Sequence, residues 1–445
     1  MSTLSPLDGR YASAVSPLVD HLSEDALNRA RVTVEVEWLI YLVDAGILPG
    51  EFSPEEREEM RGIVVDAAEL AEIEAETRHD VKAVEYYLRR RVKYPDIVHI
   101  FCTSEDINNL AYALTIRDAV HTVWLPAAKR LVGAIEELAY EHRDQPMLSR
   151  THGQTATPTT LGKEMAVFAW RLTRQLERIA KTEYLGKING ATGTYGAHVA
   201  ALPEVDWITH SRLFVESLGL TWNPLTTQIE SHDWQAELYS DIARFNRILH
   251  NFATDVWTYI SLDYFHQNLA AQGSTGSSTM PHKVNPIRFE NAEANLEISC
   301  ALLDVLAATL VTSRMQRDLT DSSTQRNIGV AFGHSLLAID NVTRGLAGLE
   351  VGTEALARDL DNAWEVLGEP IQQAMRAAAI NGATGMDNPY ERLKDLTRGQ
   401  KVTEEMMRDF ISSLGIPAEI EARLLELTPA GYTGLASKLV DHLGE

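Results

Sequence analysis

The sequence is poor in cysteine and lacks the short motifs of several common enzyme classes. Cys102 and Cys300 are the only cysteines among 445 residues, which excludes a disulfide framework and a thiolate metal cluster. HExxH, CxxC and closely spaced sets of histidine and carboxylate are also absent, so we expect no metal. The chain has no GxxxxGK followed by Ser or Thr, no strand-linked GxGxxG and no GxSxG. We therefore expect no nucleotide cofactor and no hydrolase elbow.

Basic residues and long apolar runs are scarce as well. Lys and Arg number 40 against 63 Asp and Glu, which gives a formal net charge of −23. Nucleic acids and anionic membranes both require a basic surface, so neither is expected as a partner. No window holds about 18 uncharged apolar residues, and the N-terminus lacks the basic and apolar regions of a signal peptide. These features predict a soluble, cytoplasmic protein.

What the chain does contain is long apolar periodicity, which predicts an all-α fold. Apolar residues recur at steps of three and four from Leu161 to Ile179 and, over about six turns, from Leu238 to Ile260. Residues 296–310 and 328–350 are apolar almost all round, which indicates burial on every side. A monomeric bundle would leave such helices one solvated face, whereas several subunits could pool them. We therefore predict a homo-oligomer with the long helices in its core.

Changes in helix length divide the chain into three predicted helical domains. They are an N-terminal domain (1–110), a central long-helix bundle (111–351) and a small C-terminal domain (352–445). Polar inserts between the long helices fall at helix ends, so they could gather at one end of the bundle. The inserts are residues 149–157, 187–200, 221–233, 273–286 and 314–327.

Insert 273–286 has the most side chains capable of chemistry. It opens the string GSTGSSTMPHKVNPIRFEN at 273–291, in which glycines flank a run of hydroxyls. Glycine permits a close approach of the backbone to a ligand. Ser277 and Ser278 are candidates for a nucleophile or a base, and Lys283 could stabilise negative charge nearby. The alternative is a flexible surface loop without chemistry.

His152, in the string RTHGQ, is the second candidate for proton transfer. It is followed by glycine and precedes an expected helix start at Thr157-Pro158, which would expose the imidazole at a helix N-terminus. The alternative is a hydrogen-bonded structural histidine.

Other polar residues lie at turns and helix starts, where structure and function are hard to separate. His79 and Lys82 share a helix face at i, i+3, which is usually a surface pair. Thr103 with Asp106 fits a capping box, although the N–H groups of such a helix start can also receive an anion. The turn at 8–11 is a surface turn or a ligand contact.

The string GSSTMPHKVNP at 276–286 resembles the loop GSSxMPxKxN of the fumarase/aspartase superfamily of fumarate-releasing lyases. Within that superfamily the chain is similar to the bacterial adenylosuccinate lyases, over essentially its whole length. One departure is Thr155, where that family commonly has proline. The supporting strings are RHDVKAVEYYL at 78–88, CTSEDINNL at 102–110, RTHGQ at 150–154, TTQIESHD at 226–233 and RDLTDSSTQRN at 317–327.

The resemblance implies an all-helical homotetramer with a shared twenty-helix core and active sites built from three subunits. It also implies an enzyme that eliminates fumarate from adenylosuccinate, giving AMP, and from the succinylated aminoimidazole carboxamide ribonucleotide of purine synthesis. By the same likeness Ser277 is the base and His152 the general acid, without metal or cofactor.

The substrate carries two carboxylates and a phosphate, so local cations must outweigh the acidic background of the chain. The positions that match nucleotide- and succinyl-binding residues of the family are Arg10, Tyr11, Arg78, His79, Asp80, Thr103, Ser104, Gln228, Ser278, Lys283, Val284, Asn285, Asn291, Arg317, Ser322, Ser323, Thr324, Gln325 and Arg326.

Two other interpretations remain open on the sequence. A sister lyase, such as an argininosuccinate lyase or a fumarase, shares the loop signature, but the strings at 78–88 and 317–327 weigh against it. A non-catalytic structural protein of the same fold is also possible, as in lens crystallins related to argininosuccinate lyase. Intact His152, Ser277 and Lys283 argue against that second alternative.

Overall fold

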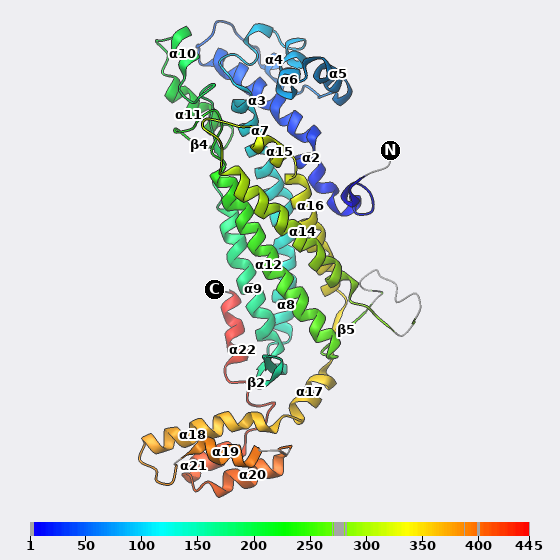
Figure 1. The fold of residues 1–445 in the computed structure, drawn as a ribbon, viewed down its shortest axis with the longest axis vertical. Coiled ribbons are helices and arrows are strands. Elements are labelled where there is room, and N and C mark those ends of the chain that lie inside the picture. Colours follow the sequence, from blue (N-terminus) through cyan, green and yellow to red (C-terminus); the bar gives the residue numbers. More distant parts are fainter. Residues whose placement is uncertain are drawn as a thin grey trace. The chain divides into compact units, whose positions relative to one another are not determined.

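The computed structural model describes residues 4–268, 270, 280, 283–386, 388–397 and 401–444. The predicted all-α class is confirmed, because helices dominate this part of the chain and its strands form short two-stranded pairs (Figure 1). None of the helices described is both long and apolar enough to cross a membrane.

The chain separates into two compact units, each built from three segments. Unit 1 contains Met1–Lys129, Arg174–His250 and Asn291–Asn341, and unit 2 contains Arg130–Thr173, Asn251–Glu290 and Val342–Glu445. The division into domains 1–110, 111–351 and 352–445 stays a prediction. The long helices that hold residues of both units are α8 (Leu125–Glu141), α9 (Leu161–Ala180), α12 (Asp233–Ser261), α14 (Ile287–Leu310) and α16 (Ile328–Leu346).

Unit 1 holds the N-terminal helices and two short parallel strands. Its other elements are η1 (Pro6–Asp8), α1 (Ala12–Val15), η2 (Ser16–Leu18), α2 (Val19–Leu22), α3 (Glu24–Asp44), α4 (Pro54–Arg61), α5 (Ala67–Thr77), α6 (Asp80–Arg89), η3 (Pro95–Ile97), α7 (Ser104–Ala119), η4 (Val120–Trp124), β3 (Leu185–Gly186), α10 (Gly196–Ala201), α11 (Trp207–Ser217), β4 (Thr221–Trp222) and α15 (Thr320–Gln325).

Unit 2 holds two antiparallel strand pairs and the short C-terminal helices. Its elements are β1 (Pro146–Thr151), β2 (Gln154–Thr160), β5 (Phe265–Gln267), β6 (Leu349–Val351), α17 (Thr353–Asp361), η5 (Trp364–Leu367), α18 (Gly368–Ile380), α19 (Pro389–Thr397), α20 (Glu404–Ser413), α21 (Ala418–Leu425), α22 (Ala436–Leu439) and η6 (Val440–Gly444).

Local sequence explains where two helices of unit 1 begin. The string Ser53-Pro54-Glu55-Glu56 predicts a helix start with a capping box, and α4 begins there: the Ser53 and Glu56 side chains each accept from the other's backbone N–H, at 3.2 and 2.8 Å. α7 starts after Thr103, whose backbone N–H donates to Asp106 Oδ2 at 2.8 Å. Both helix starts are confirmed.

Segments of α12, α14 and α16 run side by side within unit 1 (Figure 1), and a buried polar ladder connects them. Trp124 Nε1 donates to Ser335 Oγ at 2.9 Å, and that hydroxyl donates to Asn246 Oδ1 at 2.8 Å. Asn246 Nδ2 then donates to Ser299 Oγ at 3.1 Å, and this hydroxyl donates to the Ala331 carbonyl at 2.7 Å. Because each of these groups is buried, another register of the helices would leave them unsatisfied.

Unit 1 contains a histidine buried among aromatic rings. His198 is fully buried and packs against the rings of Phe101, Tyr195 and Trp207. Neither of its ring nitrogens has a hydrogen-bond partner among the described residues. Burial lowers the pKa of His198 from 6.5 to about 4, so the ring is held neutral in the folded protein.

From the lowered pKa of His198 we predict that the free energy of unfolding of unit 1 decreases at acid pH. The unfolded chain binds the extra proton below about pH 6.5 and the folded chain only near pH 4, so stability is lost as pH falls between these values. At about pH 5 the loss from His198 should be about 2 kcal/mol. Urea unfolding at about pH 7 and pH 5 measures it. His198→Phe should show a smaller difference between the two pH values than wild type, and an unchanged difference would contradict the assignment.

Candidate functional site

The sequence places a helix start at Thr157-Pro158, and this prediction is wrong. Residues Gln154–Thr160 form strand β2, which pairs antiparallel with β1, and α9 begins only at Leu161. The hydroxyl and proline resemble a helix start, but the segment is rich in β-branched threonine, which favours a strand once a partner is present. His152 is therefore exposed in a hairpin turn and not at a helix N-terminus.

The turn that carries His152 has two residues, both in the left-handed region. The φ angles of His152 and Gly153 are 54° and 74°. Positive φ at both central residues is the property of the type I′ turns that connect strands with a right-handed twist. Hairpin geometry thus presents the imidazole at the tip of unit 2's β1–β2 pair.

Hydrogen bonds among Arg150, Tyr264 and Asp359 form a triangle that fixes the stem of this hairpin within unit 2. Arg150 donates to Tyr264 Oη and to Asp359 Oδ2, both at 2.7 Å, and Tyr264 Oη donates to the same carboxylate oxygen at 2.6 Å. Burial raises the pKa of Tyr264 to about 12, so the phenol remains a donor. Arg150 lies two residues before His152. These hydrogen bonds therefore connect the turn that carries His152 to α17.

The other predicted residues of unit 2 follow the hydroxyl-rich segment. Lys283 is exposed, and its backbone N–H donates to the Met280 carbonyl at 2.9 Å. The Val284 carbonyl accepts from Gln267 Nε2 at 3.1 Å, and the Asn285 carbonyl accepts from the backbone N–H of Ile287 at 2.9 Å. These contacts place the segment beside β5 and at the start of α14.

The predicted base Ser277 and its neighbour Ser278 lie outside the described residues. Their roles stay predictions from the sequence motif.

Within unit 1, three of the polar inserts contact one another. Asn189 Nδ2 donates to Thr226 Oγ1 at 2.8 Å, which joins insert 187–200 to insert 221–233. Arg317 Nη1 donates to Gln228 Oε1 at 3.4 Å, which joins insert 221–233 to insert 314–327. The predicted gathering of inserts is thus visible inside this unit.

The junction of α5 and α6 presents three predicted residues in succession. Arg78 ends α5 in the left-handed region with φ of 54°, and His79 caps α6 by accepting from the Lys82 backbone N–H at 3.4 Å. Asp80 begins the helix, and its Oδ2 lies 2.7 Å from Nη2 of the buried Arg31. Burial alone would raise the pKa of Asp80, but the charge and hydrogen bond of Arg31 outweigh it and the pKa is lowered.

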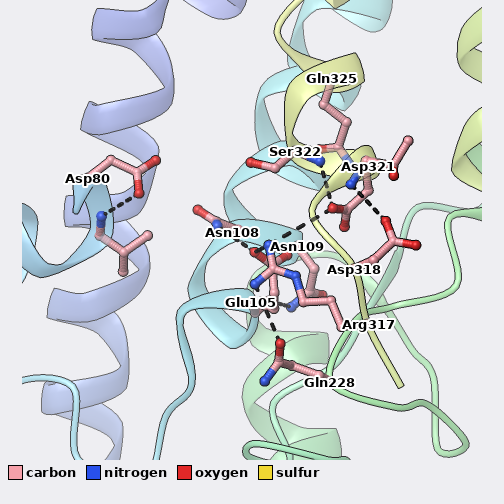
Figure 2. Close-up of polar contacts among 12 residues, drawn as sticks. Asp80, Glu105, Asn108, Asn109, Gln228, Arg317, Asp318, Asp321, Ser322 and Gln325 are labelled. Atoms are coloured by element: carbon pink, nitrogen blue, oxygen red, sulfur yellow. Dashed lines mark hydrogen bonds and ion pairs between the residues drawn. The ribbon is translucent and has the colours of Figure 1, made fainter. Parts of the chain in front are cut away.

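Arg317 lies between the start of α7 and α15. Its Nη2 is 2.9 Å from Glu105 Oε1 and 3.9 Å from Asp321 Oδ1, and Figure 2 shows the guanidinium directed at Glu105 and Gln228. Arg317 Nε is buried and has no partner among the described residues. Thr103 and Ser104, directly before Glu105, are partly buried at the same helix start. This cluster places a cation beside the N-terminus of α7, where anions are favoured.

The predicted residues 322–326 form most of α15 and the position after it. Ser322 N–H donates to Asp321 Oδ1 at 2.6 Å, Ser323 N–H to the Leu319 carbonyl at 3.4 Å, and Thr324 Oγ1 to the Thr320 carbonyl at 2.8 Å. These hydrogen bonds stay within α15 and the residue before it. The remaining two face neighbouring elements: Gln325 Nε2 is 3.4 Å from His232 Nε2, and Arg326 Nη2 is 3.9 Å from Asp80 Oδ2.

A cavity of about 120 Å³ separates α15 from the N-terminal helices of unit 1. Asp80, Ser322, Gln325 and Arg326 all line it, together with Arg31. The lining also includes the carboxylates of Glu24 and Glu74, so a phosphate or carboxylate there would be bound through Arg326 and the hydroxyls.

Three predicted residues form a separate contact in unit 1. Asn291 Nδ2 donates to Tyr11 Oη at 3.3 Å, and the Arg10 guanidinium lies 5.9 Å from the centre of the Tyr11 ring. The turn at 8–11 is therefore packed against α14 through its aromatic residue.

Several polar residues of the site have no place among the predictions. Arg31, Glu105, Asn108, Asp321 and His232 are buried and bond the predicted residues or one another. All except Arg31 lie within the strings that carry the family resemblance, which was the available signal. No group of three or more His, Cys, Asp or Glu that could hold a metal ion lies among the described residues.

Comparisons with known proteins agree along the whole chain. A model of the Lyase family matches residues 9–299, and a model of the adenylosuccinate lyase C-terminal region matches residues 313–433. The adenylosuccinate lyase of Escherichia coli (strain K12) is 49% identical over 457 residues, with 100% of this chain and 99% of the relative covered. The adenylosuccinate lyase of Haemophilus influenzae (strain Rd) is 48% identical at the same coverage.

A solved structure supports the fold independently. The fumarate lyase from Mesorhizobium sp. BNC1 superposes with a TM-score of 0.77 at 20% identity, covering 96% of this chain and 97% of that one. At this identity the likeness concerns the fold alone. The family models and the full-length relatives carry the assignment: the chain belongs to the adenylosuccinate lyase family.

Proposed function

We propose that the chain is an enzyme that eliminates fumarate from adenylosuccinate to give AMP. It also cleaves succinylaminoimidazole carboxamide ribonucleotide to aminoimidazole carboxamide ribonucleotide, an earlier step of purine synthesis. The observation that carries the proposal is the 49% identity to a protein named adenylosuccinate lyase over the full length of both chains. We also propose a cytoplasmic location, which fits a role in purine synthesis.

The proposed chemistry is general acid–base catalysis. Ser277 removes the proton beside a succinyl carboxylate, giving a doubly charged aci-carboxylate, and His152 then protonates the leaving nitrogen. The exposed imidazole on an anchored hairpin supports the acid role of His152, because the ring can reach a ligand while its backbone stays fixed. Lys283 is proposed to stabilise the intermediate's negative charge.

Substrate binding is proposed to use the predicted residues of both units. In unit 1 Arg326 and Ser322 at the cavity and Arg317 at the start of α7 offer cations and a hydroxyl, next to carboxylates such as Asp80 and Glu105. This supports recognition of an anionic nucleotide in spite of the net charge of −23.

A homotetramer with a shared twenty-helix core is also proposed. Ile298 and Val305, one heptad apart on α14, are 46% and 56% exposed in the single chain. Such an apolar stripe on a long helix fits burial against another subunit. In this assembly the central domain, 111–351, would supply the shared helices, flanked by domains 1–110 and 352–445.

Turnover of adenylosuccinate tests the proposal. Purified protein should convert it to AMP and fumarate, followed by the change in ultraviolet absorbance. Absence of turnover together with cleavage of argininosuccinate would favour the sister lyase. A folded chain inactive on both would favour a structural protein.

A further inference from the structure

An unbroken chain of charged and amide groups connects two parts of the candidate site in unit 1. Asp80 Oδ2 bonds Arg31 Nη2 at 2.7 Å, and Arg31 Nε donates to Asn108 Oδ1 at 2.9 Å. Asn108 Nδ2 donates to Glu105 Oε1 at 2.8 Å, and the same oxygen lies 2.9 Å from Arg317 Nη2. Four consecutive contacts thus run from the start of α6 through α3 and α7 to the segment before α15.

The three middle members of this chain are buried. Arg31, Glu105 and Asn108 are 5%, 4% and 7% exposed. Each nitrogen of the Arg31 guanidinium has an acceptor, since Nη1 donates to Asn28 Oδ1 at 2.9 Å. A buried charge without partners would cost several kcal/mol, so these groups persist because each one satisfies the next.

The amide in the middle can take only one orientation. Arginine has donors only, so Asn108 must turn its oxygen toward Arg31. An ionised glutamate has acceptors only, so the amide nitrogen must face Glu105. Because a flipped amide would lose both hydrogen bonds, Asn108 holds the side chains of Arg31 and Glu105 in a fixed relative position.

The chain has a clear consequence for Arg317, a long side chain that loses rotamer freedom when it binds an anion. Glu105 and Gln228 already hold its two terminal nitrogens, so most of the side-chain entropy is lost before the anion binds. Glu105 in turn is fixed by Asn108 and, through it, by Arg31. We propose that Arg31, Asn108 and Glu105 are positioning residues that hold Arg317 ready for an anionic group of the nucleotide and fix Asp80 as a hydrogen-bond acceptor at the other end of the chain. This inference rests on the proposed function.

The test is Glu105→Gln, which keeps an accepting oxygen for both donors and removes the charge. We expect the KM for adenylosuccinate and the Kd for AMP, measured by calorimetry, to rise about 10-fold, with kcat changed less than about 3-fold. In an Arg317→Gln background the same change should add less than about 2-fold, because Glu105 acts through Arg317. Multiplicative effects in the double variant, or an unchanged or lower Kd for AMP in Glu105→Gln, would overturn the positioning role.

Glu85→Gln is the matched control. Glu85 is 5% exposed and pairs with Lys82 at 2.7 Å and Arg89 at 3.3 Å, but it does not contact the chain. Its substitution should leave the Kd for AMP unchanged. A wild-type protein that neither binds AMP nor cleaves adenylosuccinate would overturn the proposed function and the positioning role with it. An active wild type matched by Glu105→Gln would overturn the positioning role alone.

Discussion

Replacing His152 with asparagine should lower kcat for fumarate release by a factor of about 10²–10⁴ and leave the protein folded. The loss is expected because the imidazole is the proposed donor of the proton to the leaving nitrogen. Asparagine is the appropriate replacement because φ at this position is 54°. Asparagine tolerates the left-handed region, and asparagine followed by glycine is the favoured pair for a two-residue hairpin turn. Alanine would add backbone strain and confuse a folding effect with a chemical one.

The measurement is steady-state turnover of adenylosuccinate, with circular dichroism and the unfolding midpoint as checks on folding. His266→Asn is the matched control, because it removes another exposed histidine of unit 2, on strand β5. We expect it to retain activity. Since Arg150, Tyr264 and Asp359 still anchor the hairpin in His152→Asn, near-normal turnover in that variant would show that the imidazole is not the acid.

Helices with strong local signals are the part of the fold that could be predicted from sequence. The capping residues at Ser53 and Thr103 mark two helix starts correctly, because a cap involves residues three positions apart. The long periodicity from Leu238 to Ile260 likewise corresponds to α12, since six turns of one apolar stripe leave little ambiguity.

The hairpin around His152 shows why other elements could not be predicted. Thr157-Pro158 has the local chemistry of a helix start, but the structure pairs Leu148 with Pro158 across two strands. Proline lacks the N–H of a ladder hydrogen bond and is therefore a poor strand signal. The outcome depends on pairing with β1, on the other side of the turn, and not on the residues next to the proline.

The candidate site divides in the same way. Asp80 and Arg317 could be proposed because they lie in strings that resemble the family's motifs. Arg31 could not, because its contact with Asn108 spans 77 residues and depends on how α3 packs against α7. In a sequence with 23% charged residues, a single buried arginine has no pattern that separates it from the many exposed ones.

The largest loss of stability is expected for Asp106→Ala. Asp106 and Lys187 form an ion pair of 2.8 Å with both side chains fully buried. The carboxylate also accepts from the backbone N–H groups of Thr103, Asn189 and Gly190 at 2.8, 3.0 and 3.1 Å. Removing it leaves a buried ammonium and three amides without their acceptor, so unfolding should become easier by roughly 3–5 kcal/mol. The urea midpoint, followed by circular dichroism at neutral pH, measures this change.

The partners of the ion pair should not be equivalent, and Lys187→Met tests this. Without Lys187, the Asp106 carboxylate keeps its three backbone donors and remains largely satisfied. Without Asp106, the Lys187 ammonium keeps the Gly190 carbonyl at 3.4 Å among the acceptors of the described residues, which cannot balance a buried charge. Lys187→Met should therefore lower the urea midpoint less than Asp106→Ala does. Equal losses would mean that the ion pair itself dominates the stability of this part of unit 1. The backbone hydrogen bonds by which Asp106 anchors insert 187–200 to the start of α7 would then contribute little.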